Sequence, residues 1–416
     1  MAMKRLLVLL SLLAAVLDVS AQTVVSGVVT DRKTGHPLSH VSILVEGEDV
    51  HTVTNEDGYF TLKTARRPTS VQLTHIGYKT QRLPLGDGAT ANLRLAMTAS
   101  SIELEEIIVS VDDPQAIVLA AMKRIEQNYA KESELVRCFY RETARRGSRF
   151  ISVAEAVMDM YKTAYGFGPD HDAVGILKGR RLMSLKASDT LGVKIQGGPV
   201  LPLVADVAKN PDYLLNREQL SQCVLRSEMP TKIGDRLQYV VSITPHSETP
   251  FALMGGRLYI DQQTLAFTRA ELQLDVSDWQ RASDFMLVRK PAGLRFRPKE
   301  LSVTVVYETD GQGVTRMSYI RNEMRFNCDW RRRLFASAYT TVSEMVVTER
   351  LRQGQEAKPP SGRASFGIKD RFYDRVEYFD DPDFWGGYNI IEPTESLEHA
   401  IGKLKKKMKQ PANFGG

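Results

Sequence analysis

The sequence predicts a mainly β protein with an α+β second domain. A small antiparallel β-sandwich comes first, and a larger antiparallel, curved sheet with packed helices follows it. Three observations predict this order. Apolar and polar residues alternate over residues 23–97 with turn residues about every ten positions, one stretch at 114–130 has helical spacing, and long alternating runs return from residue 237 onward.

The N-terminus has the order of a cleaved secretory signal peptide, residues 1–21. Lys4 and Arg5 precede an apolar run of 12 residues, and small residues end at Ala21. That run is too short to cross a bilayer as a helix, which needs about 20 residues. Gln22, not a cysteine, follows the expected cut, so no lipoprotein anchor is expected at this site. The sequence therefore predicts a periplasmic or outer-membrane-associated protein.

Charge and length limit the classes of function and suggest the domain organisation. The 416 residues include 55 basic and 50 acidic side chains, and loss of the signal peptide changes the net charge from +5 to +4. That is too small an excess to indicate nucleic-acid binding.

No later run is apolar enough to predict a transmembrane helix. The expected parts are the signal peptide 1–21, the sandwich 22–98, a linker 99–112, an α+β domain 113–372, and a C-terminal aromatic segment with a basic helix 373–416.

The three cysteines do not form a disulfide framework. Cys138, Cys223 and Cys328 are odd in number and widely spaced, so at most one pair can form within the chain. No Cys-x-x-Cys occurs. Small buried apolar side chains are the expected role.

The first domain repeats a period of two. Val41, Ile43 and Val45 point to one face of a strand, and three further pairs repeat the pattern, namely Phe60 and Leu62, Val71 and Leu73, and Leu93 and Leu95. Residues 55–58 predict a hairpin turn in which Gly58 adopts a positive φ. The inward faces of these strands are expected to bury one compact core.

Three spaced motifs then resemble a known family. Residues 27–43 read G-x-V-x-D-x-x-T-G-x-P-L-x-x-V-x-I, residues 54–60 read TNEDGYF, and residues 76–79 read IGYK. They are similar to the carboxypeptidase-like regulatory domain family. The resemblance implies a prealbumin-like, seven-stranded β-sandwich. In metallocarboxypeptidases this domain braces a catalytic domain, and in Gram-negative envelope proteins it often stands at the N-terminus, before a TonB-dependent receptor.

The resemblance does not imply peptidase activity. A zinc carboxypeptidase site needs His-x-x-Glu and a distant histidine, and none of the seven histidines has a glutamate three positions later. His36, His40, His51 and His75 are expected on different strands or turns, at the surface or at strand edges. No catalytic residue, cofactor or metal is assigned from the sequence.

The larger domain begins with a helix. Asp113 is suited to cap it and Pro114 to its first turn. The helix is expected over 114–130, and its apolar stripe should enter the core through Ile117, Ala121, Ile125 and Tyr129. Residues 138–142 and 151–165 resemble a segment that follows such regulatory domains in other secreted proteins, and they imply no activity. Arg141 and Glu142 are expected to form an exposed ion pair, and residues 166–172 a loop.

Long alternating runs predict the second sheet. They are separated by short turns with no helical run between them, and they span residues 237–243, 257–261, 265–276, 301–309 and 335–349. Such spacing favours an antiparallel sheet with the early helices packed on it. The architecture resembles the half-barrel of periplasmic lipoprotein carriers, whose concave face holds an acyl chain.

The C-terminal segment is rich in aromatic residues and lysine. Phe384, Trp385 and Tyr388 are expected to pack on the large domain. A helix over 397–408 carries lysines that suit a solvated helix end, with peripheral contact to an anionic membrane as the alternative. The nearby carboxylates lack the ligand spacing of a calcium loop, namely Asp380, Asp381 and Asp383.

These patterns favour a non-enzymatic binding or scaffold protein of the cell envelope, with a protein, glycan or lipid partner. No nucleophile elbow, phosphate loop or dinucleotide fingerprint occurs. Two alternatives stay open. A long apolar concave pocket would favour a lipid or lipoprotein carrier. A buried polar cluster that contains His171 or His246 would favour a hydrolase or peptidase.

Overall fold

The structure is a computed structural model, and it describes all but the termini and several short segments. The described residues are 22–86, 90–101, 113–185, 198–211, 215–246, 249, 251–287, 292–330, 336–370, 372–378, 381 and 383–409. The expected signal peptide, most of the expected linker and Asp380 lie outside them. No helix in the described part is long and apolar enough to cross a membrane.

Seven strands form the N-terminal module, as the resemblance implied. A three-stranded sheet has the order β4-β1-β7, with β1 (Thr23–Asp31), β4 (Tyr59–Thr64) and β7 (Leu93–Met97). A four-stranded sheet has the order β3-β2-β5-β6, with β2 (Ser42–Val45), β3 (His51–Val53), β5 (Ser70–Thr74) and β6 (Gln81–Pro84). The predicted inward residues share one core, in which all are buried except Leu93, which is partly buried against it.

Gly58 has the positive φ that the sequence predicted, at +77°. The predicted hairpin is wrong, however, because the strands on either side belong to different sheets. The turn at Asn55–Gly58 instead carries the chain from β3 across the core to β4. A Cβ atom at Gly58 would lie 2.6 Å from the carbonyl oxygen of Val29, so glycine is needed for space as well as for its φ.

Twelve strands form the second sheet, in the order β11-β12-β13-β14-β15-β16-β17-β8-β9-β10-β18, with β19 beside β10. Neighbours are antiparallel apart from β10 and β19. The strands are β8 (Glu134–Arg146), β9 (Arg149–Lys162), β10 (Ala173–Met183), β11 (Cys223–Ile233), β12 (Arg236–Pro245), β13 (Met254–Asp261), β14 (Phe267–Leu274), β15 (Leu294–Thr309), β16 (Thr315–Trp330), β17 (Ser337–Gln353), β18 (Ser365–Phe366) and β19 (Glu377–Tyr378).

All five predicted runs are strands of this sheet, namely β12, β13, β14, β15 and β17. The prediction that no helix lies among them is wrong, because α7 (Trp279–Met286) separates β14 from β15. The Asp278 carboxylate caps α7 by accepting hydrogen bonds from two backbone N–H groups. The domain boundaries proposed from the sequence stay predictions, and β19 lies beyond the one at residue 372.

The first predicted helix is divided in two. Asp113 caps α2 (Pro114–Lys123) as expected, and α3 (Ile125–Asn128) follows after a break at Arg124. The remaining short helices are α4 (Leu201–Ala205), α6 (Arg217–Ser221), η2 (Pro169–His171), η4 (Gly198–Val200), η5 (Gly354–Glu356), η6 (Gly362–Ala364) and η7 (Phe372–Asp374). The C-terminal helix is α8 (Glu395–Lys409).

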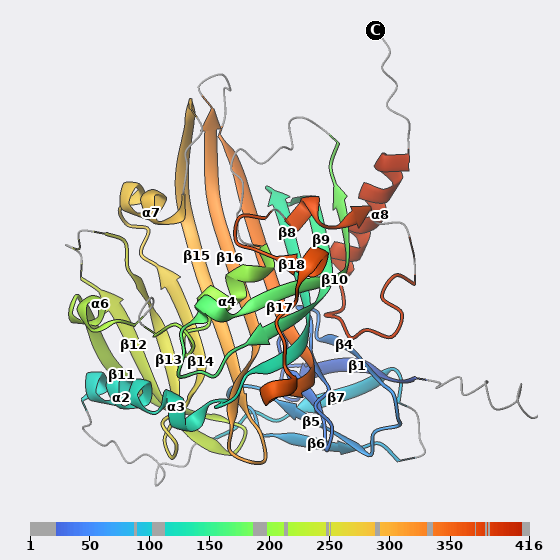
Figure 1. The fold of residues 1–416 in the computed structure, drawn as a ribbon, viewed down its shortest axis with the longest axis horizontal. Coiled ribbons are helices and arrows are strands. Elements are labelled where there is room, and N and C mark those ends of the chain that lie inside the picture. The colour runs from blue at the N-terminus through green and yellow to red at the C-terminus, as the bar shows by residue number, and fades with distance from the viewer. Residues whose placement is uncertain are drawn as a thin grey trace, which may run out of the picture.

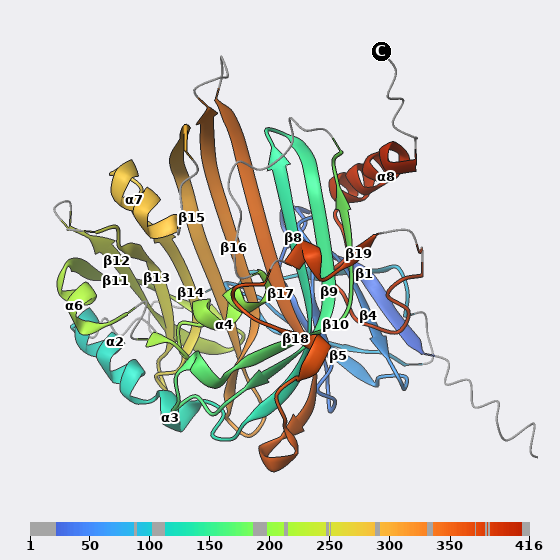
Figure 2. The same ribbon diagram turned by 45° about the horizontal axis from the view of Figure 1, so that its top comes forward.

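The large sheet is covered on both faces. We call the face that packs against α2, α3 and α4 the inner face, and its core includes the predicted stripe from Ile117 to Tyr129. The sheet bends around these helices, while the module lies against the opposite, outer face (Figure 1, Figure 2). Outer-face side chains from four strands, β8, β9, β16 and β17, form a separate core with Val53 of the module and Trp385.

Alternation along β8 explains why one predicted ion pair is wrong. Successive side chains of a strand point to opposite faces, so Arg141 and Glu142 cannot meet. The Arg141 guanidinium lies on the outer face, 2.7 Å from Oε1 of Glu155 on β9. Glu142 lies on the inner face, where it accepts a hydrogen bond from the Tyr140 hydroxyl at 3.1 Å.

The C-terminal segment packs on the sheet, as the sequence predicted. Trp385 is 6% exposed and its ring meets that of Phe139 edge to face, with Phe384 and Tyr388 packed around the same core. Helix α8 buries Leu397 and Leu404 against β9 and β10. Its lysines at 403, 406 and 407 are exposed, which fits a solvated helix end.

Candidate functional site

A cleft of about 410 Å³ lies where the module meets the large sheet. We call it the junction cleft. The module lines it with residues near the β2–β3 turn and on β5, namely Leu44, Val45, Gly47, Glu48, Asp49, His51 and Gln72. The large sheet lines it with the β15–β16 turn and one residue of β17, namely Glu308, Thr309, Asp310, Gly311 and Arg350.

Backbone contacts hold the two sides of the cleft in register. Val50 of the module and Glu349 of β17 form an isolated antiparallel bridge. Next to it, the backbone N–H of Arg350 donates to the carbonyl oxygen of Asp49 at 3.3 Å, and the two side chains lie 3.6 Å apart. On the other side, the Ser42 hydroxyl donates to the Glu308 carboxylate. These contacts join the module to β17 on one side of the cleft and to β15 on the other.

The β15–β16 turn is ordered by Asp310. Its Oδ1 accepts hydrogen bonds from the backbone N–H groups of Gln312 and Val314, each at 2.9 Å. Burial by itself raises the pKa of the Asp310 carboxyl, but these bonds and the Arg316 guanidinium lower it below its ordinary value. Asp310 is therefore charged, and its carboxylate oxygens are mostly occupied by hydrogen bonds from its own turn and by Arg316.

The lining of the cleft is acidic. It contains four carboxylates, at Glu48, Asp49, Glu308 and Asp310, and one guanidinium, at Arg350. His51 also lines the cleft; it is 3% exposed, and its Nε2 has no hydrogen-bond partner among the described residues. Burial lowers the pKa of His51 below its ordinary value, so the imidazole is neutral at neutral pH and does not offset the carboxylates.

A charged network fixes the other side of the junction. Arg321 of β16 lies 3.0 Å from Glu344 of β17 and 3.0 Å from Glu56 of the module. The His40 imidazole of the module approaches Glu344 at 3.9 Å. Arg141 donates to the carbonyl oxygen of Ile391 at 2.7 Å and so ties the C-terminal segment to the same face. These contacts join the module, the sheet and the C-terminal segment. They link residues far apart in the sequence, so a short sequence motif could not have predicted them.

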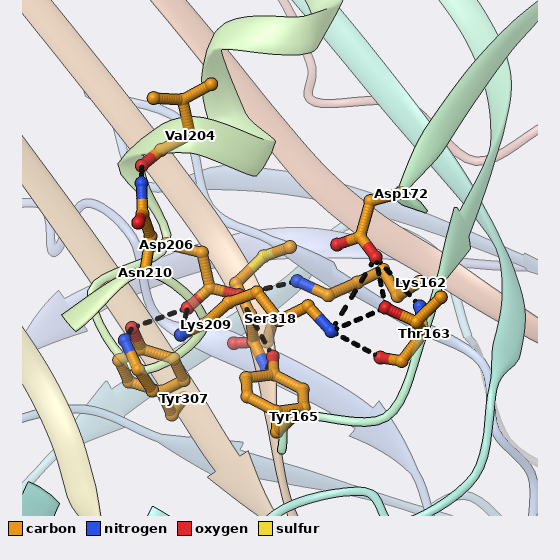
Figure 3. A network of polar contacts seen from close by, with 12 residues as sticks. Lys162, Thr163, Tyr165, Asp172, Val204, Asp206, Lys209, Asn210, Tyr307 and Ser318 are labelled. Carbon is orange, nitrogen blue, oxygen red and sulfur yellow. Dashed lines mark hydrogen bonds and ion pairs between the residues drawn. The ribbon is translucent and has the colours of Figure 1, made fainter. Parts of the chain in front are cut away.

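A second polar cluster lies on the inner face, beneath α4 (Figure 3). Asp206 is its centre and is 0% exposed. Its Oδ2 accepts from Lys162 Nζ at 2.5 Å and from the Tyr165 hydroxyl at 3.0 Å. Its Oδ1 accepts from the Tyr307 hydroxyl at 2.8 Å. These contacts join the segment that follows α4 to β9 and β15.

Lys209 extends this cluster toward the loop after β9. Its Nζ donates to the carbonyl oxygens of Thr163 and Ala164, each at 2.6 Å, and lies 3.6 Å from Asp172 (Figure 3). Burial lowers the pKa of Lys209 to about 8. Asp206 and Lys209 are both buried, so the cluster suits an anchor for α4 better than a reaction centre.

The histidines do not converge. His171 and His246 are exposed, and neither belongs to the Asp206 cluster. Of the early histidines, His51 lines the junction cleft and His40 approaches Glu344, whereas His36 is exposed. Within the described ranges, no group of three or more His, Cys, Asp or Glu side chains is arranged to hold a metal ion.

Comparison with known proteins identifies the module. The model of the CarboxypepD_reg-like domain matches residues 25–109. The TonB-dependent receptor P3 of Formosa agariphila is 32% identical over 85 residues, which are 20% of this chain and 8% of the receptor. The chain thus matches only a small part of that relative's length.

Solved structures similar to this chain share little sequence with it. A DUF1329 family protein from Desulfovibrio piger aligns over 57% of this chain and 94% of its own, with 12% identity and a TM-score of 0.23. A LolA superfamily protein from Nitrosomonas europaea aligns over 56% and 94%, with 9% identity and a TM-score of 0.17. Scores this low transfer neither ligand nor function. What the comparisons establish lies at the N-terminus, where residues 25–109 of this chain are a CarboxypepD_reg-like domain.

Proposed function

We propose that this chain is a non-enzymatic binding or scaffold protein of the cell envelope. In this proposal the CarboxypepD_reg-like domain braces the large sheet, and a partner binds in the junction cleft. One observation carries it: the lining of the cleft comes from both parts of the chain, so the binding surface exists only when they are docked. About 410 Å³ is within the usual size of a ligand site.

The docking itself supports a bracing role. The outer-face core joins Val53 of the module to Phe139, Tyr319 and Val346 of the sheet. The bridge at Val50 and the ion pair at Glu56 add polar contacts on either side of this core. Because apolar packing and charge pairing act together, the module should keep a fixed orientation on the sheet.

An envelope location is part of the proposal. It is supported by the order of charged, apolar and small residues up to Ala21. The relationship of the module to part of a TonB-dependent receptor is compatible with it. The protein would act in the periplasm or at the outer membrane after cleavage before Gln22.

The carrier and hydrolase alternatives have less support. A carrier of the half-barrel type would hold its ligand on the inner face, but side chains of α2, α3 and α4 are packed into the core there. A hydrolase would need an accessible polar cluster, and the Asp206 cluster is buried. The junction cleft is open at the surface and needs no rearrangement to receive a ligand.

The proposal is tested by filling the cleft. Gly311 lines it and has open space around the position of a Cβ, so Gly311→Trp should block binding without disturbing the fold. Gly168→Trp is the matched control, because this glycine is also exposed and unobstructed but lies outside the cleft lining. Mature protein is titrated calorimetrically with oligosaccharides, lipid vesicles, and acidic and basic peptides. A ligand that binds the control and wild type but not Gly311→Trp supports the proposal; no such ligand in any class refutes it.

A further inference from the structure

We infer that the junction cleft receives a basic side chain, lysine or arginine, of a partner polypeptide. This inference rests on the proposed function and names the chemistry of the partner. It follows from the charges in the lining, from an unpartnered buried nitrogen, and from the apolar wall beside them.

The four carboxylates of the lining are not equally available. Asp49 lies beside Arg350, and Asp310 is held by its own turn and by Arg316. Glu308 accepts a hydrogen bond from Ser42 at one of its two carboxylate oxygens. Glu48 is half-buried and forms no ion pair with the other described residues. Glu48 and Glu308 therefore leave negative charge at the cleft that the chain itself does not neutralise.

His51 provides the second, independent observation. Buried polar atoms in native proteins almost always have a hydrogen-bond partner. Nε2 of the buried His51 has none within the part of the chain that the structure describes. Its neutral imidazole can accept a hydrogen bond from an ammonium or guanidinium group. A cation in the cleft would interact with this nitrogen and with the carboxylates of Glu48 and Glu308 together.

The remaining lining favours a long basic side chain over other ligands. Leu44 and Val45 supply an apolar wall on which the methylene stem of lysine or arginine can lie. Of the described residues that line the cleft, only His51 has an aromatic ring, and no larger ring is present on which a sugar could stack. Phosphate-bearing ligands would meet the carboxylates with like charge. A cleft of about 410 Å³ holds one such side chain with its flanking backbone.

The test uses the full mature chain and tetralysine amide as the probe. Calorimetric titration compares wild type with the double variant Glu48→Gln/Glu308→Gln, in which glutamine at 308 can still accept from Ser42. We expect binding to weaken about tenfold, because two charge-assisted contacts become neutral. Glu126→Gln/Asp284→Asn removes the same charge from exposed positions on α3 and α7 and should leave binding unchanged.

A second readout reports on the buried nitrogen. Imidazole resonances of ¹³C,¹⁵N-histidine-labelled protein should shift at His51 on addition of tetralysine amide and stay unchanged at exposed His36. Fully acetylated tetralysine, which lacks the side-chain charges, should produce neither heat nor a shift. Circular dichroism of each variant verifies that it is folded, and Gly311→Trp should abolish binding by filling the same space.

The outcomes separate this inference from the proposed function. Equal weakening in both double variants, or none in either, means that tetralysine binds by general charge attraction, and the inference is wrong. If Gly311→Trp blocks a different ligand while tetralysine is unaffected, the inference is wrong and the proposed function stands. If Gly311→Trp blocks no ligand, both are wrong.

Discussion

Arg321 on β16 and Glu344 on β17 lie directly opposite each other, with 3.0 Å between Nη1 of the arginine and Oε1 of the glutamate. The second guanidinium nitrogen, Nη2, reaches Glu56 of the module at 3.0 Å. Burial by itself raises the pKa of the Glu344 carboxyl, but the His40 imidazole and the Arg321 guanidinium lower it to about 2. One arginine thus stabilises a half-buried carboxylate of the sheet and joins the sheet to the module.

Arg321→Met should destabilise the protein by about 1–3 kcal/mol, because the half-buried Glu344 carboxylate would lose its guanidinium partner. The measurement is urea unfolding at neutral pH. Arg325→Met on the same strand is the control; this arginine is 54% exposed and pairs at the surface, so its loss should cost less than about 1 kcal/mol. Equal effects of the two substitutions would contradict the role given to Arg321.

Glu142→Gln should stabilise the protein above neutral pH. Burial raises the pKa of Glu142 above its ordinary value, to about 7, so the folded state holds a proton that the unfolded state releases. Wild-type stability should therefore fall as pH rises from about 4.5 to 7, by up to about 3 kcal/mol, and the glutamine variant should not share this loss. Denaturant unfolding of both proteins at several pH values measures the free energy of unfolding and its dependence on pH. A difference that does not change with pH would show that Glu142 is not protonated in the folded state.

Gly58→Val should cost more stability than Gly35→Val. Both glycines have positive φ, +77° and +72°, so valine is strained at either position by about 1–3 kcal/mol. Only at Gly58 would the new Cβ also approach the carbonyl oxygen of Val29, at 2.6 Å, whereas Gly35 has open space. The melting temperatures of the two variants are compared. Gly35→Val measures the backbone strain alone, and Gly58→Val measures the strain together with the steric clash. Similar melting temperatures would refute the close approach at Gly58.

Lys162→Met should loosen the inner-face anchor. Asp206 would keep its hydrogen bonds from the two tyrosines but lose its cationic partner in a site without solvent, at a cost of about 3–5 kcal/mol. The segment around α4 should also become sensitive to limited proteolysis before the sheet does. Lys131→Met, at an exposed position nearby in sequence, should have little effect. Resistance to protease equal to that of wild type would contradict the anchor.

The mature protein is not expected to release C-terminal amino acids from peptides, with or without added zinc. Carboxypeptidase chemistry needs a metal held by spaced histidine and glutamate side chains and a carboxylate that activates water. Chromatography of peptide digests measures the release. Zinc-dependent release that chelation abolishes, and that mutation of the histidines also removes, would restore the enzyme hypothesis.

Local pattern was sufficient for the N-terminal module and for several strands of the large sheet. The strand at Val41, Ile43 and Val45 and the turn at Gly58 could both be predicted from a short stretch of sequence. The strand follows from the burial of one face, and the turn follows from the backbone preference of glycine. The strand pattern of β8 and β9 was harder to see because charged residues lie on a buried face. Arg141 and Glu155 are tolerated there because each neutralises the other across two strands.

The junction cleft was decided by tertiary structure alone. Glu48 and His51 are close in sequence, but Glu308 and Arg350 come from strands far along the chain, and only the docking of the module brings the four together. The sequence by itself was enough for the regulatory-domain-like sandwich and the β-rich remainder, because these follow from short motifs and short-range periodicity, and the signal peptide stays a prediction. The site depends on which surfaces come into contact in the folded protein. The pattern of side chains in a strand shows which face is buried, but it does not show which distant part of the chain packs on that face.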